Sequence, residues 1–375
     1  MGRGFRRHPF FFFPYFQQKI LQTGKGWLCK LLAEWECRSL RSMIREFEPH
    51  PLLKSGHAQT IAGAFVPRRF DLPRAEEQLF EVEPGSRLLG KCHWQAGKRR
   101  DAPVLVIVHG LEGSSDSNYM LGVAEKAFAA GFHVVRMNQR NCGGTEGLSP
   151  TLYNSGMSGD YRAVLEELAG RDAFEEIFFA GYSMGGNLVT KMAGEFGEAA
   201  PRELRGVCGV CPAIDLAACA DALERRQNYF YERHFVSALM SRYARKARLF
   251  PERYARDGFG PVRTVREFDD KITAPAFGYS DAQEYYEAAS AKRVLANARV
   301  PLLLIAAQDD PFVPYAAFPA ANVTQNPRIE FVAPEHGGHC GFISRHGGAE
   351  RFWAEQRIVE FCKQRLEEIK RGAAG

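Results

Sequence analysis

The distribution of apolar residues along the chain predicts short strands separated by helices. The clearest strands are continuous apolar runs such as PVLVIV (103–108) and PLLLIA (301–306). A strand that is covered on both faces has no polar side to present to water, so its sequence is apolar throughout. Strands are expected at residues 79–82, 88–94, 103–108, 133–137, 177–180, 204–210, 301–306 and 329–332.

Helical periodicity falls between these runs, at residues 117–130, 159–169, 184–196 and 348–370. Strands that alternate with helices form a mostly parallel, doubly wound α/β sheet with helices on both faces. Residues 213–298 interrupt this alternation. They carry no strong strand signal, but they include helical stretches at 219–249 and 281–297 that are rich in Arg and Tyr. We interpret this segment as a helical insertion between two strands of the sheet.

Composition is that of a globular protein, and the charge is unevenly distributed. The 375 residues are 45% apolar and 25% charged, which excludes a mainly disordered chain, a collagen or a coiled coil. The net charge is +5, but residues 1–42 alone carry eight bases and two acids. The remaining 41 bases and 42 acids leave the body near neutrality, so no nucleic-acid partner is expected.

The basic segment 1–42 is also rich in aromatic residues. Its apolar run FFFFPYF (10–16) is too short to span a bilayer and contains a proline. We expect 1–42 to be a poorly ordered extension, or sequence upstream of a start at Met43. The alternatives are a signal sequence or membrane contact through an interfacial helix around Trp27 and Trp35.

The nine cysteines are scattered and odd in number, which favours a reducing, cytoplasmic location. Cys208 and Cys211 form a CxxC inside an apolar, strand-like stretch. Since no second pair or histidine follows at zinc spacing, we interpret both as buried small side chains. We therefore expect neither a metal nor a cofactor, and no phosphate-binding glycine loop is present.

The strongest chemical signal is Gly181-Tyr182-Ser183-Met184-Gly185, a GxSxG pattern. It follows an apolar strand and opens a helical stretch, which is the context that a nucleophile elbow requires. The tight turn between strand and helix would expose the hydroxyl of Ser183 above the sheet. The start of the following helix favours developing negative charge.

A serine nucleophile needs a base and a group that orients the base. His339 lies in EHGGHCGF after the last strand and is our candidate base, with His336 as the alternative. Asp310 lies in QDDPFVP after the strand at 301–306 and is our candidate acid, with Asp309 as the alternative. The order Ser183, Asp310, His339 is the one found in α/β-hydrolases.

Acyl transfer also needs donors for the tetrahedral oxyanion. We assign these to the backbone N–H groups of Met184, just after the nucleophile, and Leu111, in the loop after PVLVIV. His109 begins this loop, and we expect it to brace the loop rather than act as a base.

Together these residues resemble the α/β-hydrolase superfamily and, more narrowly, the YheT/EMB8-like (AB hydrolase 4) group of esterases and lipases. The matching segments include HPLLKSGHAQTI (50–61), VHGLEGSSDSNY (108–119), GYSMGGNL (181–188), AAQDDPFVP (306–314) and EHGGHCGF (335–342). The resemblance spans about residues 45–370 and implies the same triad. One departure is Asn141, where relatives more often have glycine; asparagine tolerates the left-handed backbone conformation.

The resemblance implies a carboxylic-ester hydrolase that acts through an acyl-enzyme on Ser183. Small-molecule or lipid-like esters such as acylglycerols are the implied substrates. The domain would cover 43–375, with the insertion at 213–298 as a cap that sets acyl-chain specificity. Phe230, Phe235, Leu239 and Tyr243 are candidate lining residues. The alternatives are an acyltransferase with the same triad, a peptidase, and a non-catalytic binding module on this scaffold.

Overall fold

The computed structural model describes residues 45–97, 101–254 and 258–373, and the extension 1–42 lies outside the described residues. Residues 47–375 group together as one unit. Its centre is an eight-stranded sheet in the order β1-β2-β4-β3-β5-β6-β7-β8. The strands are β1 (Glu76–Glu83), β2 (Ser86–His93), β3 (Val104–Val108), β4 (His133–Met137), β5 (Ile177–Tyr182), β6 (Leu204–Val210), β7 (Leu302–Ile305) and β8 (Ile329–Val332).

The predicted strands are all present, and the mostly parallel sheet is confirmed. Strand β2 pairs antiparallel with both β1 and β4, and the pairs from β4 to β8 are parallel. The central strands β3, β4 and β5 are buried at every residue. This burial explains their continuous apolar sequences, because helices cover both faces of the sheet.

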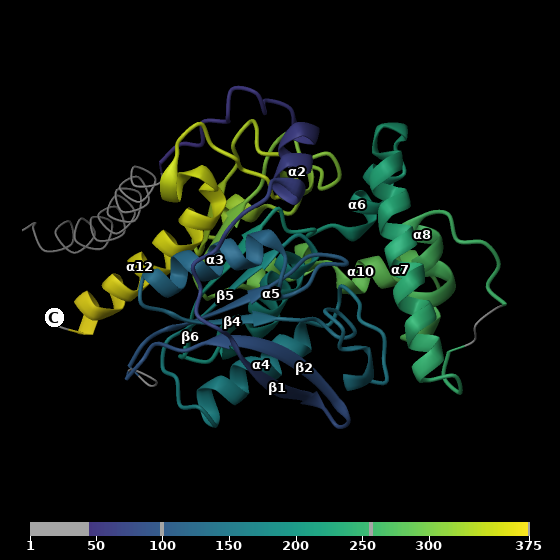
Figure 1. Cartoon of the computed structure of the whole chain (residues 1–375), viewed down its shortest axis with the longest axis horizontal. Coiled ribbons are helices and arrows are strands. Elements are labelled where there is room, and N and C mark those ends of the chain that lie inside the picture. The colour runs from purple at the N-terminus through teal and green to yellow at the C-terminus, as the bar shows by residue number, and fades with distance from the viewer. Residues whose placement is uncertain (1–44, 98–100, 255–257, 374–375) are drawn as a thin grey trace, which may run out of the picture. The chain divides into compact units, whose positions relative to one another are not determined.

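Helices pack on the sheet in pairs (Figure 1). Helix α3 (Asn118–Ala129) packs against α12 (Trp353–Ala373), and α4 (Ser158–Gly170) packs against α5 (Met184–Phe196). These are the four helices expected from the sequence. Helix α12 begins later than predicted, because residues Gly348–Arg351 form a separate 3₁₀ turn.

The chain between β6 and β7 is helical, and no strand occurs among its described residues. We call this segment the cap. Its helices, several of which are labelled in Figure 1, are α6 (Leu216–Leu223), α7 (Tyr229–Leu249), α8 (Val265–Phe268), a π-helical turn (Asp269–Thr273), α9 (Ala274–Ala276) and α10 (Ala282–Ala289). The helical stretch expected at 219–249 consists of two helices: α6 ends at Leu223 and α7 begins at Tyr229.

Helix α2 (Gly56–Phe65) was not expected from the sequence. Ser55 caps it by accepting a hydrogen bond from the N–H of Ala58. Two of its glycines pack closely on other parts of the chain: a Cβ on Gly56 would meet the carbonyl of Asp309, and one on Gly63 would meet Gly341. Since small residues form this interface, the helix shows no strong apolar stripe.

In the described part of the chain, no helix is long and apolar enough to cross a membrane.

Candidate active site

Ser183 lies in a strained turn between β5 and α5. Its backbone has φ 53° and ψ −118°, a conformation that residues with a side chain rarely adopt. The flanking glycines make the turn possible. A Cβ on Gly181 would lie 2.2 Å from the carbonyl oxygen of Gly185, and one on Gly185 would lie 2.4 Å from that of His109. Strain of this kind is typical of functional sites.

The backbone around Ser183 leaves donors near its hydroxyl. Met184 is the first residue of α5, and the first N–H groups of a helix have no acceptor within it. The loop that contains Leu111 approaches from β3: a Cβ on Gly110 would lie 3.1 Å from the Cβ of Ser183. Leu111, Ser183 and Met184 also line the same cavity. This arrangement suits the expected oxyanion hole.

His339 and Asp310 form a buried pair. Nδ1 of His339 lies 2.8 Å from Oδ2 of Asp310, and the two side chains are 11% and 1% exposed. The other oxygen of Asp310 accepts the N–H groups of Phe312 and Val313 at 3.0 and 2.9 Å. The carboxylate is therefore fixed by its own loop and orients the imidazole.

The alternative residues Asp309 and His336 pair with each other instead. Nδ1 of His336 lies 3.3 Å from Oδ2 of Asp309, and both side chains are more exposed than those of the first pair. The other oxygen of Asp309 accepts the N–H of Gly338. The sequence left two acids and two histidines open, and the structure separates them into a buried pair and an outer pair.

The end of β6 connects the serine to the histidine loop. The N–H of Ser183 donates to the carbonyl of Val210 at 2.9 Å, and the thiol of Cys340 lies 3.8 Å from the same carbonyl. The ring of Phe312 packs on His339, with 4.1 Å between ring centroids, and Phe312 lines the same cavity as Ser183. Ser183, Asp310 and His339 thus follow the carboxyl ends of β5, β7 and β8, at one edge of the parallel part of the sheet.

The pKa of His339 reflects opposing influences. Burial lowers it, but the carboxylate of Asp310 and a thiolate at Cys340 raise it, and the net shift is upward. Burial raises the pKa of Cys340, while Cys211 and His339 lower it, with a net shift downward. Each charged form stabilises the other, so Cys340 favours the protonated imidazole.

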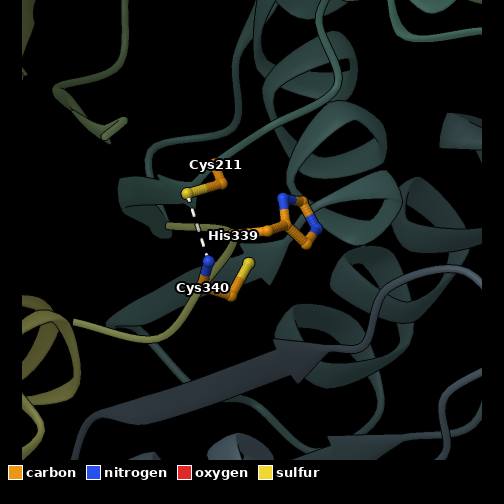
Figure 2. A group of neighbouring side chains, drawn as sticks. All are labelled: Cys211, His339 and Cys340. Atoms are coloured by element: carbon orange, nitrogen blue, oxygen red, sulfur yellow. Dashed lines mark hydrogen bonds between the residues drawn. The ribbon is translucent and has the colours of Figure 1, made fainter. Parts of the chain in front are cut away.

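Figure 2 shows Cys211 and Cys340 together on one side of the His339 ring. The N–H of Cys340 donates to the sulfur of Cys211 at 3.4 Å. One ligand atom from each of the three residues lies within 4.8 Å of the others, which makes this the one candidate metal-ligand group in the described residues. Since Nδ1 of His339 already pairs with Asp310, only Nε2 could bind a metal while that pairing is kept. Sequence spacing missed this cluster because Cys211 is over a hundred positions from the other two.

His109 is buried and braces the loop that contains the expected oxyanion donor Leu111, which we call the oxyanion loop. Its Nε2 accepts the N–H of Gln139 at 3.1 Å, which leaves Nδ1 to donate to the carbonyl of Gly110 at 2.7 Å. Burial lowers the pKa of His109 to about 4. The ring is therefore neutral at physiological pH and keeps these two hydrogen bonds.

An ion pair that the sequence analysis missed joins the cap to this loop. Arg242 of α7 donates from Nε and Nη2 to both carboxylate oxygens of Glu112, each at 2.9 Å, and it also donates to the carbonyl of Asn141. The two side chains are 8% and 6% exposed. The hydroxyl of Tyr153 donates to the same carboxylate at 2.5 Å. In the sequence, the only signal for this pair was an acid in a Gly- and Ser-rich loop.

Asn141 keeps the left-handed conformation that glycine would adopt there, with φ 65°. Its amide group adds contacts that glycine would lack: it donates to the carbonyl of Thr151 at 3.0 Å and accepts from Lys246 at 2.6 Å.

A cavity of about 930 Å³, its open mouth included, lies between the cap and Ser183. Its wall is mainly apolar, and Phe235, Leu239 and Tyr243 line it as expected. The expectation for Phe230 is wrong, because that side chain is 83% exposed and lies outside the cavity. Polar groups at the wall include Asp269, whose pKa burial raises to about 6 and whose carboxylate accepts from Tyr286 at 2.8 Å.

The family described as alpha/beta hydrolase fold matches residues 103–345. The chain belongs to the α/β-hydrolase family. Among curated proteins, YheT of Escherichia coli (strain K12) is 34% identical to it over 328 residues, which cover 87% of this α/β-hydrolase and 95% of YheT.

Two further relatives have names that describe lipid substrates. Phospholipase ABHD3 of Mus musculus is 30% identical to this α/β-hydrolase over 255 residues, covering 68% of the chain and 60% of the relative. Monoacylglycerol lipase of Saccharomyces cerevisiae is 28% identical over 275 residues, covering 71% of the chain and 60% of the relative.

Among solved structures, the Pyrococcus furiosus esterase Pf2001 aligns with a TM-score of 0.53 and 16% identity, covering 80% of this chain and 98% of that one. A likeness at this identity concerns the fold alone.

Proposed function

We propose that this α/β-hydrolase cleaves carboxylic esters through an acyl-enzyme on Ser183. The observation that carries the proposal is the buried His339–Asp310 pair, 2.8 Å between Nδ1 and Oδ2, at the strand ends that also hold the Ser183 elbow. The esterase- and lipase-type relatives support the reaction class.

In the proposed reaction, His339 takes the proton of the Ser183 hydroxyl as its oxygen attacks the ester carbonyl. Asp310 holds the imidazole in position and stabilises its positive charge. The N–H groups of Leu111 and Met184 donate to the oxyanion. When this intermediate collapses, the alcohol leaves with the proton from His339. Water, deprotonated by His339, then attacks the acyl group and releases the carboxylic acid and the free serine.

We infer that the acyl group is lipid-like, because the wall beside Ser183 is mostly apolar. Leu216, Leu223 and Leu239 of the cap contribute to it, and all three are buried. Each buried methylene contributes about 0.8 kcal/mol to binding, so a chain that fills this cavity would bind better than an acetyl group. Acylglycerols belong to the class of substrates that fits.

The test is ester turnover by Ser183→Ala. We expect hydrolysis of a p-nitrophenyl ester to fall by at least about 10⁴-fold, because the nucleophile is lost. Ser155→Ala is the matched control, since Ser155 is a buried serine of the same cavity that hydrogen-bonds to Tyr285 and Asn187 rather than to the proposed triad. It should retain activity. Turnover that persists in Ser183→Ala would refute the proposal.

Product analysis with an added alcohol separates the two fates of the acyl-enzyme. Free acid as the main product supports a hydrolase. Dominant transfer of the acyl group to the alcohol would instead make the protein an acyltransferase with the same nucleophile.

A further inference from the structure

Three large apolar side chains are exposed where α2 and α7 begin. Leu52, before α2, is 84% exposed, and Tyr229 and Phe230, at the start of α7, are 53% and 83% exposed. The two helices are in contact there: Nδ1 of His57 lies 3.2 Å from the hydroxyl of Tyr231, and the two rings stack. Exposed apolar side chains that gather in one region mark interaction surfaces.

Basic side chains lie close to these residues along the chain. Lys54, Arg225 and Arg226 are exposed, and among the described residues none of the three lies within ion-pair distance of a carboxylate. The neighbouring acids Asp221 and Glu224 both pair with Arg266. The surface is therefore both apolar and positively charged. We call it the rim patch, and its members are Leu52, Lys54, Arg225, Arg226, Tyr229 and Phe230.

The rim patch lies close to the reacting groups. Tyr231, next to Phe230, packs on Phe312 at 5.3 Å between ring centroids, and Phe312 packs on His339 at 4.1 Å. On the other side, Thr60 of α2 accepts the N–H of His339 at 2.8 Å. Two aromatic rings, those of Tyr231 and Phe312, thus link the edge of the patch to His339.

We propose that the rim patch docks this enzyme on the surface of an anionic phospholipid bilayer. Aromatic and aliphatic side chains would enter the boundary between head groups and acyl chains, while Lys54, Arg225 and Arg226 contact phosphate groups. The unpaired positive charge favours this occupant over an apolar protein surface, which would leave three cations without partners. The inference rests on the proposed function in one respect: docking would give an ester in the bilayer a short path to Ser183, the proposed nucleophile.

The first experiment measures binding of the full chain to vesicles by co-sedimentation. The protein carries Ser183→Ala so that no lipid is consumed, and the vesicles contain phosphatidylcholine and phosphatidylglycerol. Adding Leu52→Ser and Phe230→Ser should weaken partitioning by about ten- to a hundredfold, because two apolar side chains no longer leave water. Arg225→Gln with Arg226→Gln should weaken binding to these vesicles more than to pure phosphatidylcholine.

Leu249→Ser is the matched control. Leu249 is 54% exposed and lies at the opposite end of α7, about 28 Å from Phe230 along the helix. Its substitution should leave partitioning within about twofold, and residues 1–42 are present in every variant. If Leu52→Ser with Phe230→Ser binds as well as the Leu249→Ser control, the rim patch is not the docking surface and the proposal is wrong.

A second readout uses the active enzyme. Leu52→Ser with Phe230→Ser should hydrolyse a soluble p-nitrophenyl ester at the wild-type rate but lose about tenfold or more on an ester embedded in the same vesicles. Equal losses on both substrates would contradict docking. The binding assay does not depend on turnover, so failure of the proposed ester hydrolysis and failure of docking give different results.

Discussion

His339 is buried between two groups that favour its charged form, Asp310 and Cys340. Their effect exceeds that of burial, so the pKa of His339 lies above its usual 6.5. Only the neutral imidazole accepts the proton of Ser183. Activity should therefore rise with pH through this raised pKa, and half-maximal kcat/KM should lie above pH 6.5.

Replacing Cys340 by Ala removes one of these groups, so the pKa of His339 should fall. The rising limb of kcat/KM against pH should then move to lower pH. Cys219→Ala is the matched control, because Cys219 is a buried free thiol that lines the cavity beside Ser183. If the rising limb of kcat/KM does not move in Cys340→Ala, the thiol does not raise the pKa of His339.

The two neighbouring acids are expected to differ sharply in importance. Asp310→Asn should lower kcat by about 10³–10⁴-fold, because the imidazole loses the carboxylate that orients it and stabilises its charge. Asp309→Asn keeps an acceptor for Gly338 and should cost less than about tenfold. Steady-state kinetics of both variants test this difference. A larger loss in Asp309→Asn would reverse the assignment.

Helix α7 is expected to hold the oxyanion loop in place through Arg242. Glu112 follows Leu111 and has a left-handed backbone with φ 57°, so its conformation depends on the contacts of its side chain. Arg242→Lys keeps the charge but loses the two-pronged hydrogen bond. In this variant the loop should shift, and the N–H of Leu111 should move with it away from the oxyanion. We therefore expect kcat to fall by roughly ten- to a hundredfold, while KM for a short ester stays nearly unchanged.

Arg245→Lys controls for loss of a cap-to-body ion pair. Arg245 lies one turn or less from Arg242 on α7 and pairs with Glu146 at 2.7 Å, away from the oxyanion loop. Its variant should keep the wild-type kcat. Equal kcat losses in the two variants would indicate a general effect of the cap rather than positioning of the loop.

The cap cavity is expected to set the preferred acyl length. Leu239 of α7 is 5% exposed and lines the cavity, so Leu239→Trp should fill part of it. The chain-length profile of p-nitrophenyl esters should shift toward shorter acyl groups, with roughly fourfold loss of kcat/KM per excluded methylene. Leu249→Trp, at the exposed end of the same helix, should leave the profile unchanged.

Across the whole molecule, the sheet was predictable because its central strands are buried on both faces. Strands such as β3 are apolar at every residue, so their burial on both faces can be read from the sequence. Helix α2 was missed because its buried residues are Gly56, Gln59 and Thr60, while its large apolar residues Ile61 and Phe65 are exposed. The break between α6 and α7 was also missed, because Asn228 ends the run by donating to carbonyls of Ala222 and Pro311, and Pro311 is distant in the sequence.

The candidate site was predictable where local sequence determines geometry. A GxSxG between strand and helix, and acid and histidine loops after later strands, can be read from neighbouring residues alone. The pairing of Arg242 with Glu112 spans 130 positions, and that of Cys211 with Cys340 spans 129. Such contacts depend on how the elements pack, which no local pattern records.

The most direct test of Ser183 as the nucleophile is covalent labelling of the native protein by a fluorophosphonate, followed by peptide mass mapping. We predict one adduct per chain, on Ser183, and strongly slowed labelling in His339→Ala, in which the serine lacks its base. No adduct, or an adduct on another residue, would contradict Ser183 as the nucleophile.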